Sequence, residues 1–137
     1  MHSEVHAAYT LTGMEFDPDV ITRKLQIAPT KTWRLGDPIQ ETILRHKHDG
    51  WSISSDLSDT DDLEDHMRAL LKLIYPRRKQ LEQLRRQYKL EAEFACAIYT
   101  YDGSRPAIHF DSEIVRQVAE LGAEIDIDLF ILDEDQE

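Results

Sequence analysis

The residues best suited to binding chemistry lie in the second quarter of the chain. Trp33, Arg34, Gly36 and Asp37 combine a large aromatic ring, a cation and a Gly-Asp turn, and Trp51 follows on what reads as a neighbouring strand. Trp and Arg are favoured at binding hot spots because they offer a large contact area and several hydrogen-bond donors. These five residues are the candidate binding site for a peptide or small ligand. The simpler interpretation is that both Trp rings complete a small core while Arg34 pairs with Asp37.

Metal chemistry is poorly supported. His46 and His48 stand at i and i+2, which on an extended strand points both rings to one side. Two ligands are too few, because a zinc site needs three or four from the protein. The acidic run over residues 56–65 lacks the alternating ligands and central glycine of a calcium loop, and helix capping explains it more simply. We expect no metal and no cofactor.

Catalytic signatures are also weak. Cys96 falls on the apolar side of an alternating strand, which predicts a buried and inert thiol. The polar faces of this strand and of the strand over residues 123–131 carry carboxylates, and paired carboxylates can do acid-base work. An open, solvated sheet face, however, would not desolvate one carboxyl and raise its pKa. The sequence therefore favours a non-enzyme; the carboxylates in question are Glu91, Glu93, Glu124, Asp126 and Asp128.

The charge balance points to the class of partner. The 137 residues include 16 Lys and Arg against 27 Asp and Glu, a formal net charge of -11. This charge repels nucleic acid and anionic membranes and favours a cationic protein partner. Residues 72–89 form a basic exception, with seven basic residues and one acid. That segment is a solvated face or docks on an acidic surface, either within the chain or on a second copy. The last arrangement predicts a homodimer.

The remaining composition fits a cytoplasmic protein. Cys96 is the single cysteine, so no intrachain disulfide can form, which suits a reducing compartment. The first nine residues have no apolar run and do not read as a secretory signal. No segment reaches the roughly 20 apolar residues that cross a bilayer.

Two periodicities define the fold. Apolar residues alternate with polar ones, as in half-buried strands, over residues 5–12, 90–100 and 123–131. Helical spacing follows Asp17-Pro18, the capping run at 58–61 and Asp111, and Pro76 interrupts the longest helical stretch. Residues 29–55 read as two or three short strands, with Asp49-Gly50 as a hairpin turn.

This order predicts one α+β domain over residues 1–137, with an antiparallel or mixed sheet and helices packed on one face. The acidic tail, residues 133–137, is expected to fray. Residues 16–21 and 110–115 match in chemistry at every position, and each begins a helix after a strand. Two related halves, as in a ferredoxin-like sandwich, would produce this echo. Shared capping requirements would also produce it.

The layout also resembles an uncharacterised bacterial family, the domain of unknown function 4279. The early cluster is its most specific part, and the later leucines suit any amphipathic helix. The resemblance implies a fold and a bacterial setting but no mechanism, so no catalytic residue is carried over. It is carried by Phe16-Asp17-Pro18-Asp19, Ile21-Thr22, Leu25, Ile27, Pro29-Thr30, Gly36-Asp37, Trp51, Leu63-Glu64, Leu70-Leu71 and Pro76.

Taken together, the sequence favours a non-catalytic bacterial protein-interaction module in the cytoplasm. One specific form is an immunity-like protein whose acidic surface neutralises a cationic toxin. The alternative is a small-ligand-binding protein or an unrecognised enzyme with a pocket near Trp33 and Trp51.

Overall fold

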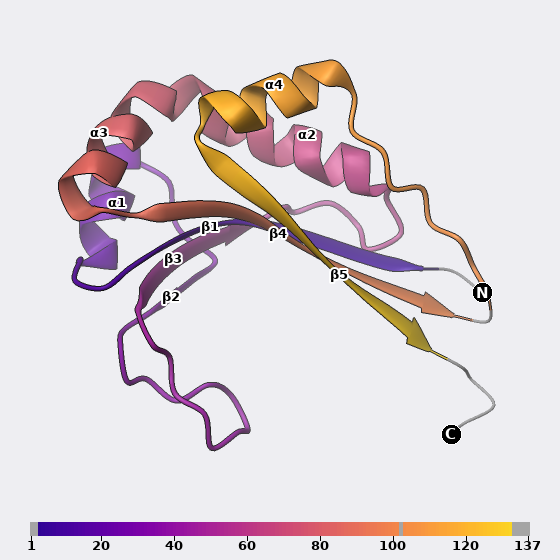
Figure 1. The fold of residues 1–137 in the computed structure, drawn as a ribbon, viewed down its shortest axis with the longest axis horizontal. Coiled ribbons are helices and arrows are strands. Elements are labelled where there is room, and N and C mark those ends of the chain that lie inside the picture. The colour runs from indigo at the N-terminus through magenta and orange to yellow at the C-terminus, as the bar shows by residue number, and fades with distance from the viewer. Residues whose placement is uncertain (1–2, 102, 133–137) are drawn as a thin grey trace.

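The computed structural model describes residues 3–101 and 103–132 and shows a five-stranded mixed sheet covered by helices on one face (Figure 1). The strands lie in the order β2-β3-β1-β4-β5. Neighbours are antiparallel except β4 and β5, which are parallel. The predicted α+β class is confirmed. The strand bounds are β1 Glu4–Gly13, β2 Lys31–Trp33, β3 Asp49–Ser54, β4 Glu91–Tyr101 and β5 Ala123–Leu132.

The helices begin where the capping residues are. Asp17 accepts a hydrogen bond from the backbone N–H of Asp19 at 2.9 Å, and Asp111 accepts one from Ile114 at 2.9 Å. Pro76 lies in a 3-10 turn between two helices, because its ring and missing N–H interrupt a regular helix. The helical elements are α1 Pro18–Leu25, α2 Leu63–Ile74, η1 Tyr75–Arg77, α3 Arg78–Tyr88 and α4 Ser112–Glu120.

The sequence echo between residues 16–21 and 110–115 is explained by this capping. Both segments place an Asp carboxylate at the start of a helix that follows a strand. The first four strands follow a β-α-β-β-α-β plan in which α2, η1 and α3 together connect β3 to β4, and α4 and β5 are added to it. A ferredoxin-like arrangement with two related halves stays a prediction.

The core lies between the sheet and the helices. The predicted apolar faces of β1 and β4 are buried there, as are the predicted apolar positions of α2. Trp51 is 0% exposed, and its Nε1 donates to Thr22 Oγ1 of α1 at 3.0 Å. Cys96 is buried on the same side. Within the described residues the helices are too short and too polar to span a membrane.

The prediction that Asp49-Gly50 forms a hairpin turn is wrong. Both residues belong to β3, which pairs with β2, and residues 34–48 form the connection. The nearly buried Asp49 carboxylate accepts hydrogen bonds from the backbone N–H of Leu35 at 2.7 Å and of Phe16 at 3.1 Å. It thus ties the 34–48 connection to the segment that leads into α1. Asp49, which the sequence suggests as a turn residue, instead accepts hydrogen bonds that hold two segments of the fold together.

Two smaller predictions are corrected. The run at 58–61 precedes the helix rather than starting it: Asp61 accepts from the Ser58 N–H at 3.1 Å in a turn, and α2 begins at Leu63. Val115, expected in the inner stripe of α4, is 53% exposed. The predicted fraying of residues 133–137 lies outside the described residues.

Replacing Asp49 with Ala should lower the free energy of unfolding by about 1–3 kcal/mol, because two backbone N–H groups lose their acceptor. Urea denaturation followed by circular dichroism measures the change. Asp56→Ala, which removes an exposed carboxylate, is the control and should stay within about 0.5 kcal/mol of the wild type. Equal stability of the two variants would show that Asp49 does not hold this junction.

Candidate functional site

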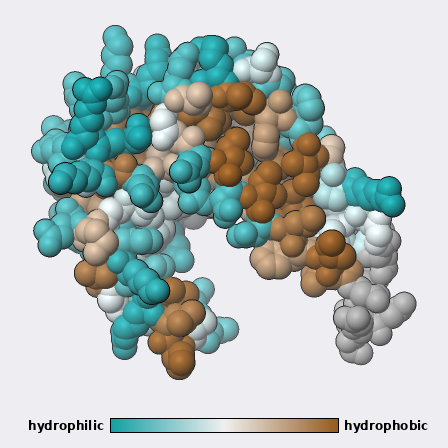
Figure 2. Space-filling model, viewed as in Figure 1, coloured by the Kyte–Doolittle hydropathy of each residue, from teal (hydrophilic) through white to brown (hydrophobic). Residues whose placement is uncertain are grey.

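The face of the sheet opposite the helices is hollowed. Figure 1 shows the 34–48 connection projecting from one side of it and the C-terminal half of β5 from the other. Figure 2 shows the hollow between these two projections. We call this surface the open face. Its side chains come from the polar positions of the alternating strands, so their register decides what meets there.

Small side chains form the floor of the open face. Ala8, Ala95 and Ala97 line a groove of about 200 Å³ together with His6 and Asp128. The groove continues past the end of β3 to Leu57 and to His66 of α2. At the far end of the floor, the Tyr99 and Phe130 rings stack with their centroids 4.8 Å apart. A shallow apolar floor of this kind suits a polypeptide segment better than a buried small molecule.

Carboxylates line the β4–β5 side of the open face. Glu93 lies opposite Glu124 in the parallel register, with Asp126 and Asp128 farther along β5. Burial raises the pKa of the Glu93 carboxyl, and the charges of Asp126, Glu124, Asp128 and Glu91 raise it further. The expectation that an open sheet face leaves every carboxyl unperturbed is therefore wrong for Glu93. Like charges crowded at this spacing oppose folding.

The carboxylates of the helix layer have cations beside them. Glu113 and Glu120 both bind Arg116, and Asp111 binds Arg68 at 2.7 Å. Hydrogen bonds lower the pKa values of all three carboxyls: those from Arg116 act on Glu113, and those from Tyr75 and then Arg116 act on Glu120. For Asp111 the largest contribution comes from the Ile114 N–H, followed by Arg68. The ion pairs found among the described residues include none of the five open-face acids. Negative charge is compensated on the helix side and left uncompensated on the open face.

An aromatic cluster occupies the β2 side of the open face. The Trp33 ring stacks on His46 with centroids 5.0 Å apart and planes 22° from parallel. Its Nε1 donates to His48 Nδ1 at 3.4 Å, and Lys31 Nζ lies 5.4 Å from the ring centroid. Burial, then Lys31 and His48, lower the pKa of His46. The two histidines pack on Trp33 rather than pointing together toward an ion.

The five residues predicted as a binding site do not form one pocket. Trp33 lies on the open face, whereas Trp51 is in the core on the other side of the sheet. Arg34 pairs with Asp17 at 2.8 Å instead of with the Asp37 carboxylate, which accepts the Arg34 backbone N–H.

Gly36 has a positive φ of 90°, as its place in a tight turn requires. Trp33, Asp37 and His46 line a groove of about 450 Å³. The two tryptophans therefore take different roles, one at the surface and one structural.

A single group of three potential metal ligands occurs within residues 3–101 and 103–132. One ligand atom each from Glu4, His6 and Asp59 lies within 4.8 Å of the others. The backbone N–H of Val5 donates to the Asp59 carbonyl at 2.8 Å, which holds the two segments together. Three ligands would leave the remaining coordination positions to water. Neither His46 nor His48 belongs to this group.

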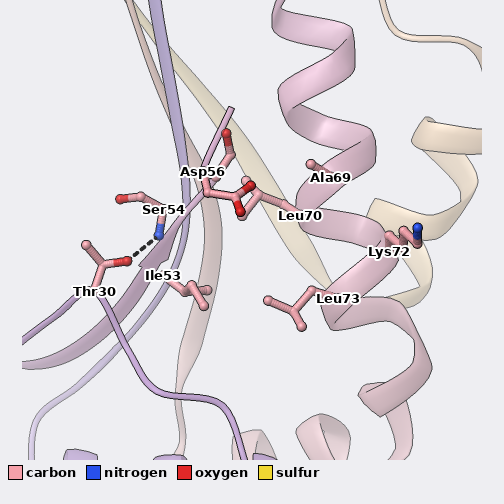
Figure 3. A pocket seen from close by; sticks show the side chains of 9 residues that line it. Thr30, Ile53, Ser54, Asp56, Ala69, Leu70, Lys72 and Leu73 are labelled. Carbon is pink, nitrogen blue, oxygen red and sulfur yellow. Dashed lines mark hydrogen bonds between the residues drawn. The ribbon is translucent and has the colours of Figure 1, made fainter. Parts of the chain in front are cut away.

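A separate cleft of about 470 Å³ lies between the end of β3 and α2 (Figure 3). Ile53 and Leu73 face each other across it, and Thr30 Oγ1 accepts the Ser54 N–H at 2.9 Å. Lys72 points away from its centre. The cleft lacks a set of converging polar groups, so it does not compete with the open face as a reactive site.

The family described as Domain of unknown function (DUF4279) matches residues 3–132. The chain belongs to this family. The match runs from before β1 to the end of β5, so the whole open face is part of the DUF4279 domain. No curated protein and no solved structure matches the chain.

Sequence reasoning missed the apolar edges of the open face. Ile43 is 98% exposed in the 34–48 connection, and Phe130 and Leu132 are 42% and 40% exposed at open-face positions near the end of β5. The signal was present at the end of β5, where the acid-apolar alternation gives way to four consecutive apolar residues, 129–132. At Ile43 the sequence offers no comparable signal.

Replacing Glu93 with Gln should stabilise the protein at pH 7 by about 0.2–1 kcal/mol, because it removes a like charge from neighbouring strands. The pKa of Glu93 is raised in the folded state, so its ionisation costs stability as pH rises through that pKa. The gain should therefore vanish below about pH 4, where the carboxyl is protonated in both states. Urea denaturation across pH 3 to 8 measures it.

The matched control for this test is Glu120→Gln, which should have the opposite sign. Glu120 binds Arg116 and Tyr75, and these contacts lower its pKa. Its variant should be less stable than the wild type at pH 7, with a difference that also disappears at low pH. If Glu93→Gln behaves like Glu120→Gln, the crowding of charge on the open face is disproved.

Gly50→Ala should displace the Trp33 ring, because a Cβ at this position would lie 2.0 Å from two ring atoms. The loss of the Trp33–His46 stack should cost about 0.5–1.5 kcal/mol. In a proton–nitrogen correlation spectrum, the indole signal of Trp33 should shift while that of Trp51 stays in place. Ser54→Ala, at an exposed position of the same strand, should move neither signal.

Proposed function

We propose that this protein is a non-catalytic protein-interaction module whose open face binds a cationic partner. The observation that carries the proposal is the contrast between the two sides of the molecule: carboxylates of the helix layer are paired with arginines, whereas Glu91, Glu93, Glu124, Asp126 and Asp128 are not. A partner that brings cations to these acids relieves their mutual repulsion. That relief adds to binding without any rearrangement of the sheet.

Shape and apolar contact support the same proposal. The hollow of the open face lies between two projections that expose apolar side chains (Figure 2). They are Ile43 and Leu44 on one side, and Phe130 and Leu132 at the open-face positions near the end of β5 on the other. Interfaces combine apolar anchors with charged groups that steer association. The open face offers both, at a net charge of -11 that attracts basic proteins at long range.

The surroundings of the side chains that could take part in catalysis favour a binding role instead. Burial raises the pKa of the Cys96 thiol to about 12, so it is not a nucleophilic thiolate at neutral pH. The carboxylates stand along strand faces in a row of similar acids rather than as an acid and a base on opposite sides of an enclosed cavity. A bacterial, cytoplasmic setting and an immunity-like role against a cationic toxin are the specific form of this proposal.

A homodimer is the second arrangement that the charges favour. The basic segment 72–89 lies in the helix layer, on the side of the sheet opposite the acids, so the two can meet only between copies (Figure 1). Part of that segment already serves the fold: Arg77 donates to the Leu25 carbonyl and Arg85 to the Leu121 carbonyl. Light scattering that finds a monomer alone at high concentration would dismiss this arrangement.

A small-ligand site is the competing function, in a narrower form than the sequence indicated. The groove beside Trp33 combines an aromatic ring with Lys31, Asp37 and His46. A ligand that prefers the folded protein raises its melting temperature. A metabolite library that produces no shift in melting temperature or Trp33 signal argues against this groove as a ligand site.

The interaction function is tested by affinity capture from host extract with matched baits. Asp126→Lys/Asp128→Lys reverses two open-face charges, and Glu15→Lys/Asp56→Lys makes the same change in net charge at exposed positions elsewhere. A partner of the open face should be retained by the wild type and the control and reduced about tenfold or more by the first variant, with retention falling as salt rises. Equal retention by all three baits, or no specific partner at any ionic strength, would refute the proposal.

A further inference from the structure

We propose that the free edge of β5 is the docking position itself: an extended segment of the partner adds to the sheet as a sixth strand, with basic and apolar residues alternating along it. This inference rests on the proposed function and specifies how the cationic partner is held. It assigns the recognition to backbone hydrogen bonds along β5 and to two rows of side chains beside them.

The backbone of β5 is available for pairing. The strand spans ten residues, Ala123–Leu132, stands at the edge of the sheet and pairs with β4. The backbone hydrogen bonds outside helices and strands in the described part of the chain involve none of these ten residues. Alternate N–H and C=O groups therefore point away from β4 toward solvent, as a template for a further strand.

The side chains of β5 present a different chemistry on each face. On the open face, Glu124, Asp126 and Asp128 are exposed carboxylates, and the apolar Phe130 and Leu132 follow them at the C-terminal end of the strand. On the helix face the apolar side chains become more exposed along the strand, to 48% at Leu129 and 77% at Ile131. Figure 2 shows the corresponding apolar surface following β5 toward its C-terminal end.

These two rows define the occupant. An added strand lies about 4.8 Å from its neighbour and sends alternate side chains to the same two faces. Residues that meet the carboxylates are stabilised by positive charge, and residues that meet Leu129 and Ile131 are stabilised by apolar side chains. The complementary sequence is an alternation of Lys or Arg with Val, Ile or Leu.

The opposite edge of the sheet, formed by β2, does not offer a long strand for pairing. Strand β2 is three residues long, Lys31–Trp33, and Arg34 beyond it is held by Asp17. Short edge strands with a Lys are a common protection against further pairing. The long edge of β5 is therefore the position where the sheet can be extended.

A second copy of this chain is a poorer occupant. In an antiparallel pair related by a two-fold axis, directly opposed residues share a face. Every register centred on a residue from Glu124 to Asp128 then sets a carboxylate of one strand against a carboxylate of the other. Two chains of net charge -11 add long-range repulsion.

The test uses the full chain and a blocked ten-residue peptide of alternating Lys and Val. In an extended strand all Lys N–H groups point to one side and all Val N–H groups to the other. Two N-methylated peptides, one methylated on every Lys and one on every Val, therefore have matched charge and composition but block opposite edges. Calorimetry at low ionic strength should show one of them binding like the parent and the other at least about tenfold weaker, because it loses several hydrogen bonds. The identity of the weaker peptide reports the direction of the added strand.

Protein variants locate the site. Ile131→Thr should weaken the parent peptide, whereas Ile43→Thr, at a more exposed apolar position across the hollow, should leave its affinity unchanged. Neither substitution touches the core. Amide exchange along residues 123–132 should slow on binding the parent peptide.

Three results would overturn the inference. If both methylated peptides bind as well as the parent, the carboxylates act as a charged surface without strand addition, and the proposed function survives. If the parent peptide does not bind at low salt, strand addition is excluded, and the affinity capture decides the proposed function separately. If light scattering shows a stable dimer that Ile131→Lys dissociates, the edge belongs to a second copy.

Discussion

The structure depends on one constraint: its helices cover a single face of the sheet. Side chains alternate along a strand, so neighbouring residues face different surroundings, as Phe94 in the core and Glu93 on the open face do. The Val, Leu, Ile, Phe and Trp side chains of β1, β3 and β4 are turned toward the one core, which leaves mainly polar side chains and alanines on the other side. The parallel pairing of β4 and β5 then brings two acidic rows side by side. The crowding of charge follows from topology rather than from any single residue.

The parts of the fold that could be predicted are those set by local periodicity. The strands around Tyr9, Phe94 and Ile127 and the helix around Met67 follow from spacing, since alternation and helical repeat are local properties. The predicted hairpin turn at Asp49-Gly50 was wrong because the role of Asp49 depends on contacts that are not local in the sequence. The carboxylate of Asp49 is used by backbone groups far away in the sequence, and no local pattern reports an acceptor of that kind.

The prediction of one site that contains both tryptophans was wrong because of the register between β2 and β3. Trp33 lies opposite Gly50 across the β2–β3 pair, so Trp51, one residue farther, must face the other side of the sheet. The spacing of the two tryptophans in the sequence does not show that they lie on opposite faces of the sheet. The sequence does explain Gly50 afterwards, because any Cβ there would occupy the space of the Trp33 ring. The acids of β5, by contrast, were placed correctly from alternation alone, because their outward direction needs no knowledge of the neighbouring strand.

The same carboxylates resolve an apparent conflict in the design of β5. A long edge strand with exposed Leu129 and Ile131 would promote aggregation if it carried no protection. Asp126 and Asp128 supply that protection in antiparallel registers centred on residues 124–128, because a second copy there brings like charges into opposition. They provide none against a basic strand, for which the same residues are attractive. In the complex that we propose, the same side chains repel a second copy and attract a basic strand, according to the sign of the partner's charge. The cost falls on the unbound protein, where burial and then the neighbouring carboxylates raise the pKa of Glu93.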